Sequence, residues 1–142
     1  MSSRGSYLLN INVGQPLTYR VGLLHKATFP PGRYIYVGSA RRGISSRIAR
    51  HHRLAEQKAG RLHWHIDYLL VNPYVQWAGS VALEDGIECE ISRIISSIKG
   101  VTAPVSRFGS SDCRKGCKAH LYLLPKSFRN PDLVKLLEMI GT

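Results

Sequence analysis

The sequence predicts a single α+β domain, in which a small β-sheet is flanked by helices, and three observations support this prediction. Short runs of alternating aromatic and β-branched residues, separated by glycine and proline, fill the early part of the chain. From residue 44 onward, several segments instead repeat their apolar residues at intervals of three and four, which is typical of helices that cover a sheet. With 142 residues, the chain is long enough to bury one core. We therefore expect one domain over residues 1–142, with its core at about 5–124 and a C-terminal helix at about 131–140.

Short strands are expected at residues 6–13, 18–23, 33–38, 74–83 and 120–124. In the third of these, Tyr34 and Tyr36 alternate with Ile35 and Val37. Because successive side chains of a strand point to opposite faces, the two tyrosines should share one face of the sheet. In the fourth, Gly79 predicts a β-bulge.

Four helices are expected after the third strand, the first beginning near Gly43 and the others over residues 62–70, 87–98 and 131–140. On the first helix, Arg47 and His51 lie one turn apart and therefore on one face. The third helix carries a stripe of isoleucines, with Cys89 on the far side among small residues. Such a side would allow another element of the chain to approach closely.

Positive charge is concentrated in one part of the chain. Residues 33–61 hold eight basic residues and one acidic residue, which is well over half of the net charge of +11. This clustering is typical of proteins that bind nucleic acid or an anionic membrane, and the neighbouring tyrosine-rich strand favours nucleic acid. No segment approaches the roughly 20 apolar residues of a membrane span, and the first residues lack the apolar core of a signal peptide. We therefore expect a cytoplasmic protein without a membrane partner; the oligomeric state is left open.

Around Trp64, the polar residues His63, His65 and Asp67 occupy every second position, and this spacing has two interpretations. On a strand these three side chains would share one side, as in a metal cluster, whereas on a helix they spread around the axis. The apolar stripe at 62–70 favours a helix. His63 and His65 are therefore interpreted as orienting or DNA-contacting groups, and Trp64 as a packing residue.

The three cysteines suggest a metal site. Cys113, Cys117 and His120 have the spacing of metal ligands, and Cys89 could supply a fourth ligand from its helix. A set of three cysteines and one histidine suits structural zinc. The alternative is that the cysteines are reduced thiols that bind nothing, since an odd number without an export signal argues against a disulfide framework.

Several short motifs occur in a defined order along the chain. They are Gly5-Ser6-Tyr7 on the first strand, Tyr36-Val37-Gly38 on the third, Arg47 and His51 on the helix that follows, and Glu88 on a later helix. Together they resemble the GIY-YIG nuclease superfamily. The stretches at 36–40, 63–70 and 108–121 resemble its Uri branch.

This resemblance implies a small, mainly antiparallel sheet flanked by helices and a metal-dependent endonuclease that hydrolyses phosphodiester bonds in DNA, with RNA as an open alternative. It implies catalytic roles for Tyr7, Tyr36, Arg47 and His51, without deciding which tyrosine activates water. It also implies that Glu88 binds magnesium or manganese, with Glu90 as the alternative ligand. These residue types suit the chemistry, because Mg²⁺ takes oxygen ligands and arginine grips phosphate as a planar fork.

Further side chains are expected to contact the nucleic acid, namely Arg41, Arg42, Arg50, Arg53, Lys58, His63 and His65. Ser39 stands where several relatives of this superfamily carry lysine. The alternative function is therefore a nucleic-acid-binding module of the same fold with weak or no turnover, stabilised by zinc. A zinc-stabilised RNA-binding protein is a third interpretation.

Overall fold

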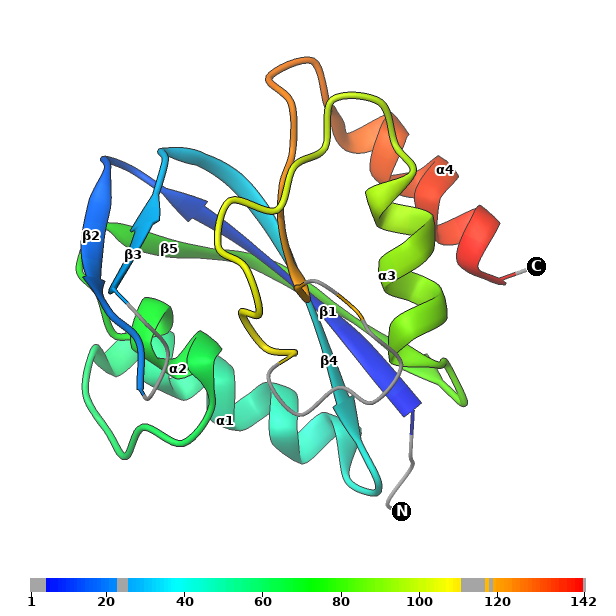
Figure 1. The fold of residues 1–142 in the computed structure, drawn as a ribbon. Helices are drawn as coiled ribbons and strands as arrows, with labels where there is room; N and C mark the ends of the chain where they lie inside the picture. The colour runs from blue at the N-terminus through cyan, green and yellow to red at the C-terminus, as the bar shows by residue number, and fades with distance from the viewer. Residues whose placement is uncertain (1–4, 23–25, 111–116, 118, 142) are drawn as a thin grey trace.

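The computed structural model describes residues 5–22, 26–110, 117 and 119–141 (Figure 1). In chain order the elements are β1 (Gly5–Val13), β2 (Leu17–Arg20), β3 (Lys26–Phe29), β4 (Gly32–Ala40), α1 (Ile44–Gln57), α2 (His65–Leu70), β5 (Val75–Glu84), α3 (Glu88–Ser96), β6 (Leu121–Leu123) and α4 (Asn130–Gly141).

The main sheet has the strand order β5-β1-β4-β6, and each neighbouring pair is antiparallel. β2 and β3 pair with each other in a separate two-stranded sheet. The predicted α+β class with a mainly antiparallel sheet is therefore confirmed. The prediction of one strand over 18–23 was wrong at its end, because β2 stops at Arg20 and the chain returns as β3. The signal that was missed is the alternation within β3, where Ala27 and Phe29 are buried while Lys26 and Thr28 are exposed.

The central strand β4 is buried on both of its faces. Tyr34 and Tyr36 enter the core beneath α1 and α2, whereas Ile35 and Val37 enter the core beneath α3 and α4. The predicted separation of tyrosines from aliphatic residues is thus confirmed. β4 extends past Gly38, where the prediction ended it, because its pairing with β1 continues to Ala40.

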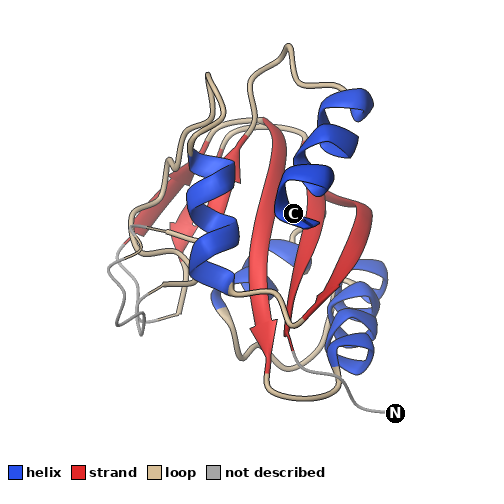
Figure 2. Ribbon diagram, turned by 90° about the vertical axis from the view of Figure 1, so that its right-hand side faces the viewer, coloured by secondary structure: helices blue, strands red, loops and turns tan. Residues whose placement is uncertain are grey.

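Helices cover both faces of the sheet (Figures 1 and 2).

The expected bulge in β5 is also confirmed, since the pairing of β1 with β5 shifts between Gly79 and Trp77. In the part of the chain that the structure describes, no helix combines the length and the apolar character needed to cross a membrane.

The pairing of β1 with β4 places Tyr7 directly opposite Gly38. A Cβ atom at Gly38 would lie only 2.3 Å from Cζ of the Tyr7 ring, so the ring occupies the space of the missing side chain. We expect Gly38→Ala to destabilise the fold by about 1–3 kcal/mol, because the ring must move. Gly14→Ala is the control, since its nearest neighbour is at 3.4 Å. Denaturant melts of the wild type, Gly38→Ala, Tyr7→Ala and the double variant test this. If Gly38→Ala lowered the free energy of unfolding equally in the Tyr7→Ala background, the explanation by the ring would be contradicted.

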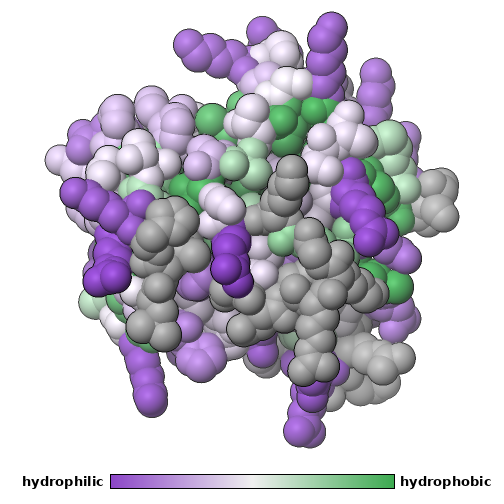
Figure 3. All heavy atoms as spheres, viewed as in Figure 1, coloured by the Kyte–Doolittle hydropathy of each residue, from purple (hydrophilic) through white to green (hydrophobic). Residues whose placement is uncertain are grey.

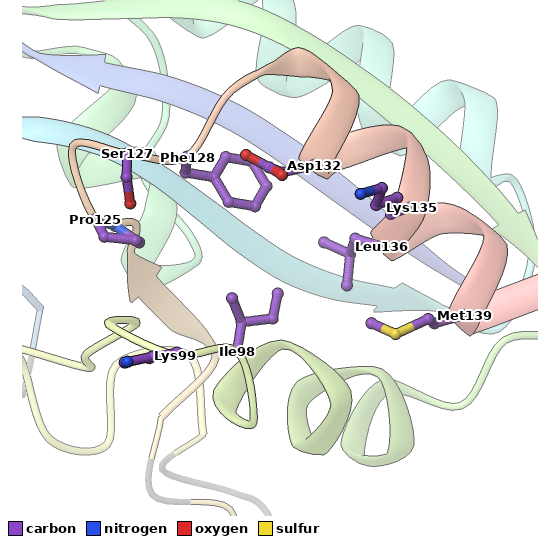
Figure 4. A pocket seen from close by; sticks show the side chains of 9 residues that line it. All are labelled: Ile98, Lys99, Pro125, Ser127, Phe128, Asp132, Lys135, Leu136 and Met139. Carbon is purple, nitrogen blue, oxygen red and sulfur yellow. The ribbon is translucent and has the colours of Figure 1, made fainter.

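A hollow opens between the end of α3 and α4 (Figure 4). It is lined by Ile98, Lys99, Pro125, Ser127, Phe128, Asp132, Lys135, Leu136 and Met139. Leu136 belongs to the core beneath α3 and α4, whereas Tyr7 belongs to the core on the opposite face of the sheet. The hollow is therefore separate from the motif tyrosines.

Candidate functional site

Tyr7 is the centre of a chain of buried polar side chains. It lies on β1 and is 2% exposed, and its hydroxyl is 2.9 Å from Nε2 of His51 on α1. Nδ1 of His51 is in turn 3.2 Å from Oδ1 of Asp67 on α2. Because an ionised carboxylate only accepts hydrogen bonds, Nδ1 of His51 must carry the proton in this contact. In the neutral imidazole Nε2 is then an acceptor, and the Tyr7 hydroxyl donates to it.

Asp67 is fully buried and orients this chain. Its Oδ1 accepts hydrogen bonds from His51 and from Nη1 of Arg50, also at 3.2 Å. Its Oδ2 accepts the backbone N–H groups of His63 at 2.8 Å and Trp64 at 2.9 Å. Burial by itself would raise the pKa of Asp67, but these hydrogen bonds outweigh it and hold the pKa well below its usual range. Asp67 is thus a buried carboxylate that stays ionised.

Arg47 lies at the Tyr7 end of this series of hydrogen-bonded side chains. Its guanidinium lies over the Trp64 ring, 4.3 Å from the centroid, and donates to the carbonyl oxygen of Ser39 at 2.9 Å. Burial raises the pKa of Tyr7 to about 12, and the charge of Arg47 and its hydrogen bond to the hydroxyl oppose this rise. The positive group that would stabilise a Tyr7 phenolate is therefore already in place.

Tyr36 lies beside Tyr7 but in a different environment. The two ring centroids are 6.4 Å apart, and the Tyr36 ring packs edge-on against Phe108. Burial raises the pKa of Tyr36 well above its ordinary value, with a further rise from the nearby Tyr7. Of these two tyrosines, Tyr7 is the one whose hydroxyl lies within hydrogen-bonding distance of His51.

Glu88 is the first residue of α3, and its carboxylate is close enough to the two tyrosines to act on them electrostatically. Its negative charge contributes to the raised pKa of both Tyr7 and Tyr36. Its Oε1 is 3.2 Å from Nδ1 of His120, and its side chain is 26% exposed. Glu90 is exposed and lines a different hollow, beside residues of β5 and α4.

The donor set around Glu88 fits the divalent metal that the resemblance implies. Glu88 has one oxygen engaged by His120 and a partly exposed carboxylate beside the tyrosines. Mg²⁺ is typically held by one or two carboxylates, with waters and substrate phosphate as its remaining ligands. The single, partly exposed carboxylate of Glu88 is therefore a suitable ligand for such an ion.

Residues 6–140 match a protein family described as a domain of unknown function, DUF123. The chain belongs to the DUF123 family. No curated protein and no solved structure matched it. The matched range includes all the residues described above for the candidate site.

The side chains that were predicted to bind nucleic acid occupy three environments in the DUF123 protein. Arg41, Arg42, Arg53 and His63 are exposed, and hydrophilic side chains project along the edge of the molecule where α1 lies (Figure 3). Arg50 is committed to Asp67 and to the carbonyl oxygen of Arg61. The other two are held by the fold. Lys58 donates to the carbonyl oxygens of Leu70 and Val75, and Nδ1 of His65 accepts the N–H of Gly109.

Three of the four predicted zinc ligands are among the residues that the structure describes. Cys89, Cys117 and His120 come together, so that their ligand atoms all lie within 4.8 Å of one another. Cys89 is buried although it lies opposite the isoleucine stripe, as its small-residue side predicted. Cys113 lies outside the residues that the structure describes.

Sequence reasoning missed two members of the site, Asp67 and Trp64. The sequence pattern predicts no role for Asp67 beside the histidines and predicts only packing for Trp64. The signal for Asp67 was present, because an acidic residue within the apolar stripe at 62–70 must find partners when it is buried. Trp64 also serves as the surface on which Arg47 and Arg50 lie.

Proposed function

We propose that this DUF123 protein is a metal-dependent DNA endonuclease of the GIY-YIG type, in its Uri branch. One observation carries the proposal: the hydrogen-bonded chain Tyr7–His51–Asp67 ends under the guanidinium of Arg47 and beside the carboxylate of Glu88. A proton acceptor, a phosphate-binding cation and a metal-binding carboxylate are thus adjacent. This combination suits hydrolysis of a phosphodiester, which is accelerated by an activated water and by positive charge at the phosphate oxygens.

In the proposed mechanism Tyr7 and His51 activate water together. With a pKa of about 12, the Tyr7 hydroxyl is protonated at neutral pH and is a poor base by itself. As a water attacks phosphorus and the bond between phosphorus and the leaving oxygen breaks, the proton of the water passes to the Tyr7 oxygen, and the Tyr7 proton passes to Nε2 of His51. The leaving oxygen departs as an alkoxide and takes a proton from solvent. The imidazolium formed in this way is stabilised by Asp67, which accepts its Nδ1–H. One proton leaves the water and one arrives on His51.

Arg47 and Glu88 act on the phosphate. The guanidinium can donate two parallel hydrogen bonds to non-bridging oxygens, where negative charge grows in the transition state. Trp64 holds the guanidinium in place from behind. Glu88 would hold the metal, which when bound supplies a Lewis acid at the phosphate and its leaving group.

The exposed arginines extend this site along α1 and provide the affinity. Arg41 and Arg42 precede α1, Arg53 lies on it, and Arg61 follows it, all with exposed side chains. Arg53 and Arg61 also line one hollow with Arg50. A row of cations beside a phosphate-binding site suits the backbone of a nucleic acid.

The proposal is tested by incubating the protein with single-stranded, duplex and branched DNA, and with RNA, in magnesium, manganese or chelator. We expect cleavage of DNA only when metal is present. In a plot of the logarithm of the association constant against the logarithm of the salt concentration, we expect a slope of about −0.9 per phosphate contact. Arg53→Ala should flatten that slope, whereas Lys126→Ala, an exposed change beyond β6, should not. Salt-sensitive binding without cleavage of any substrate would instead favour the binding module that Ser39 suggests.

A further inference from the structure

Three side chains with affinity for soft metals meet beside Glu88. Cys89 comes from α3, Cys117 from the segment before β6, and His120 immediately precedes β6. The two sulfur atoms and one ring nitrogen of His120 all lie within 4.8 Å of one another. Cys89 is 6% exposed and His120 is 1% exposed, while Cys117 is half-buried. Segments almost thirty residues apart in the chain therefore place their ligand atoms around one interior point.

His120 supplies a second, independent observation. Its Nδ1 is 3.1 Å from the carbonyl oxygen of Gly109 and 3.2 Å from Oε1 of Glu88, so this nitrogen carries a proton that it donates to oxygen. Its Nε2 is buried and has no hydrogen-bond partner among the residues that the structure describes. A buried polar atom without a partner is costly and rare in folded proteins. A buried Nε2 lone pair without a partner, on a ring that offers a nitrogen within 4.8 Å of two thiol sulfurs, suits a metal ligand.

We propose that Cys89, Cys117 and Nε2 of His120 bind one zinc ion. Two thiolates and an imidazole form a set that zinc prefers, and their softness disfavours magnesium and calcium. Zinc–sulfur bonds of about 2.3 Å would place the two sulfurs roughly 3.8 Å apart, which is compatible with ligand atoms that all lie within 4.8 Å of one another. Among the described residues the set has three protein ligands, and water or another group would take the fourth tetrahedral position.

The zinc ion would also position Glu88. Ligand histidines commonly donate their second N–H to a carboxylate or a backbone carbonyl, which fixes the orientation of the ring. His120 does so toward both Glu88 and Gly109. Zinc would then hold the Glu88 carboxylate at the start of α3 through His120 and leave its second oxygen available for another ligand. Only this consequence depends on the proposed function; the zinc site does not.

The test is the metal content of the full chain, purified without an affinity tag from cells grown with added zinc. We expect about one zinc ion per chain, a lower melting temperature after a strong chelator removes it, and recovery when zinc is returned. Cys89→Ser and His120→Ala should each retain far less zinc than the wild type. His52→Ala is the matched control, because that histidine is exposed and pairs only with Glu56 and Trp77 in the contacts seen here.

Since Cys89 and His120 are buried, their variants can fail to fold, and the wild type therefore carries the decisive measurement. Cobalt added to the metal-free protein should give the visible bands of a tetrahedral site and the near-ultraviolet charge transfer of cobalt–thiolate bonds. A wild-type protein without stoichiometric zinc, whose melting is indifferent to chelator and to added zinc, would overturn the proposal. These readouts use no nucleic acid, and Arg47→Ala should keep its zinc while losing cleavage, so the two proposals fail separately.

Discussion

Arg47→Ala is expected to slow DNA cleavage by about 10²–10³-fold, because the variant loses a preorganised donor to the oxygens that gain charge in the transition state. The loss should fall mainly on kcat, since the exposed arginines along α1 still bind the DNA backbone. Arg47→Lys should recover only part of the rate, because an ammonium cannot form the two parallel hydrogen bonds of a guanidinium. Single-turnover cleavage of a labelled duplex at saturating protein measures this step directly.

The control for Arg47→Ala is Arg93→Ala. Arg93 is an exposed arginine on α3, a different helix from the one that carries Arg47. It should leave the cleavage rate unchanged. Both variants should melt close to the wild-type temperature, because exposed or partly exposed substitutions usually change stability by less than about 0.5 kcal/mol. A large loss of stability in Arg47→Ala, in parallel with the loss of rate, would assign Arg47 a structural role over Trp64 instead.

Asp67→Asn is expected to destabilise the fold by about 3–5 kcal/mol, which corresponds to a fall in melting temperature of roughly 10–17 °C. The carboxylate accepts two hydrogen bonds at each oxygen, from Arg50 and His51 on one side and from two backbone N–H groups on the other. An asparagine has one acceptor oxygen, so its NH₂ group must face one of these donor pairs. Urea melts of both proteins measure the difference in the free energy of unfolding.

The pH dependence of this difference identifies its cause. The pKa of Asp67 is depressed in the folded state, so the carboxylate contributes its stability fully above the unfolded pKa of about 4. That contribution is lost as the pH falls toward the folded pKa. The gap between wild type and Asp67→Asn should therefore be constant near neutral pH and shrink at about pH 3.

Asp85→Asn is the matched control, because Asp85 is exposed and its positive φ of 58° suits asparagine. It should leave stability nearly unchanged at either pH. If Asp67→Asn behaved in the same way, the buried chain through His51 would not be a stabilising network. Loss of cleavage with full stability would then assign Asp67 to positioning His51 alone.

Much of the architecture could be predicted from local pattern. The alternation of Tyr34 and Tyr36 with Ile35 and Val37 specified two buried faces before any partner was known, since side chains alternate along every strand. Gly79 marked the bulge in β5. The hairpin of β2 and β3 was missed at its second strand, because four residues with two exposed positions give a short signal.

For the candidate site, the sequence alone determined which chemical groups are present and their order along the chain: two tyrosines, an arginine and a histidine one helical turn apart, a glutamate on a later helix, and the cysteines. The tertiary structure alone decided how they connect. It linked Tyr7 rather than Tyr36 to His51, brought Asp67 to the far side of that imidazole, and placed Glu88 within electrostatic reach of the tyrosines while Glu90 lines a separate hollow. The physical reason is that a hydrogen bond depends on distances of about 3 Å between atoms on different elements. Periodicity specifies the face on which a side chain lies, but only the packing of α1, α2 and α3 against the sheet sets those distances.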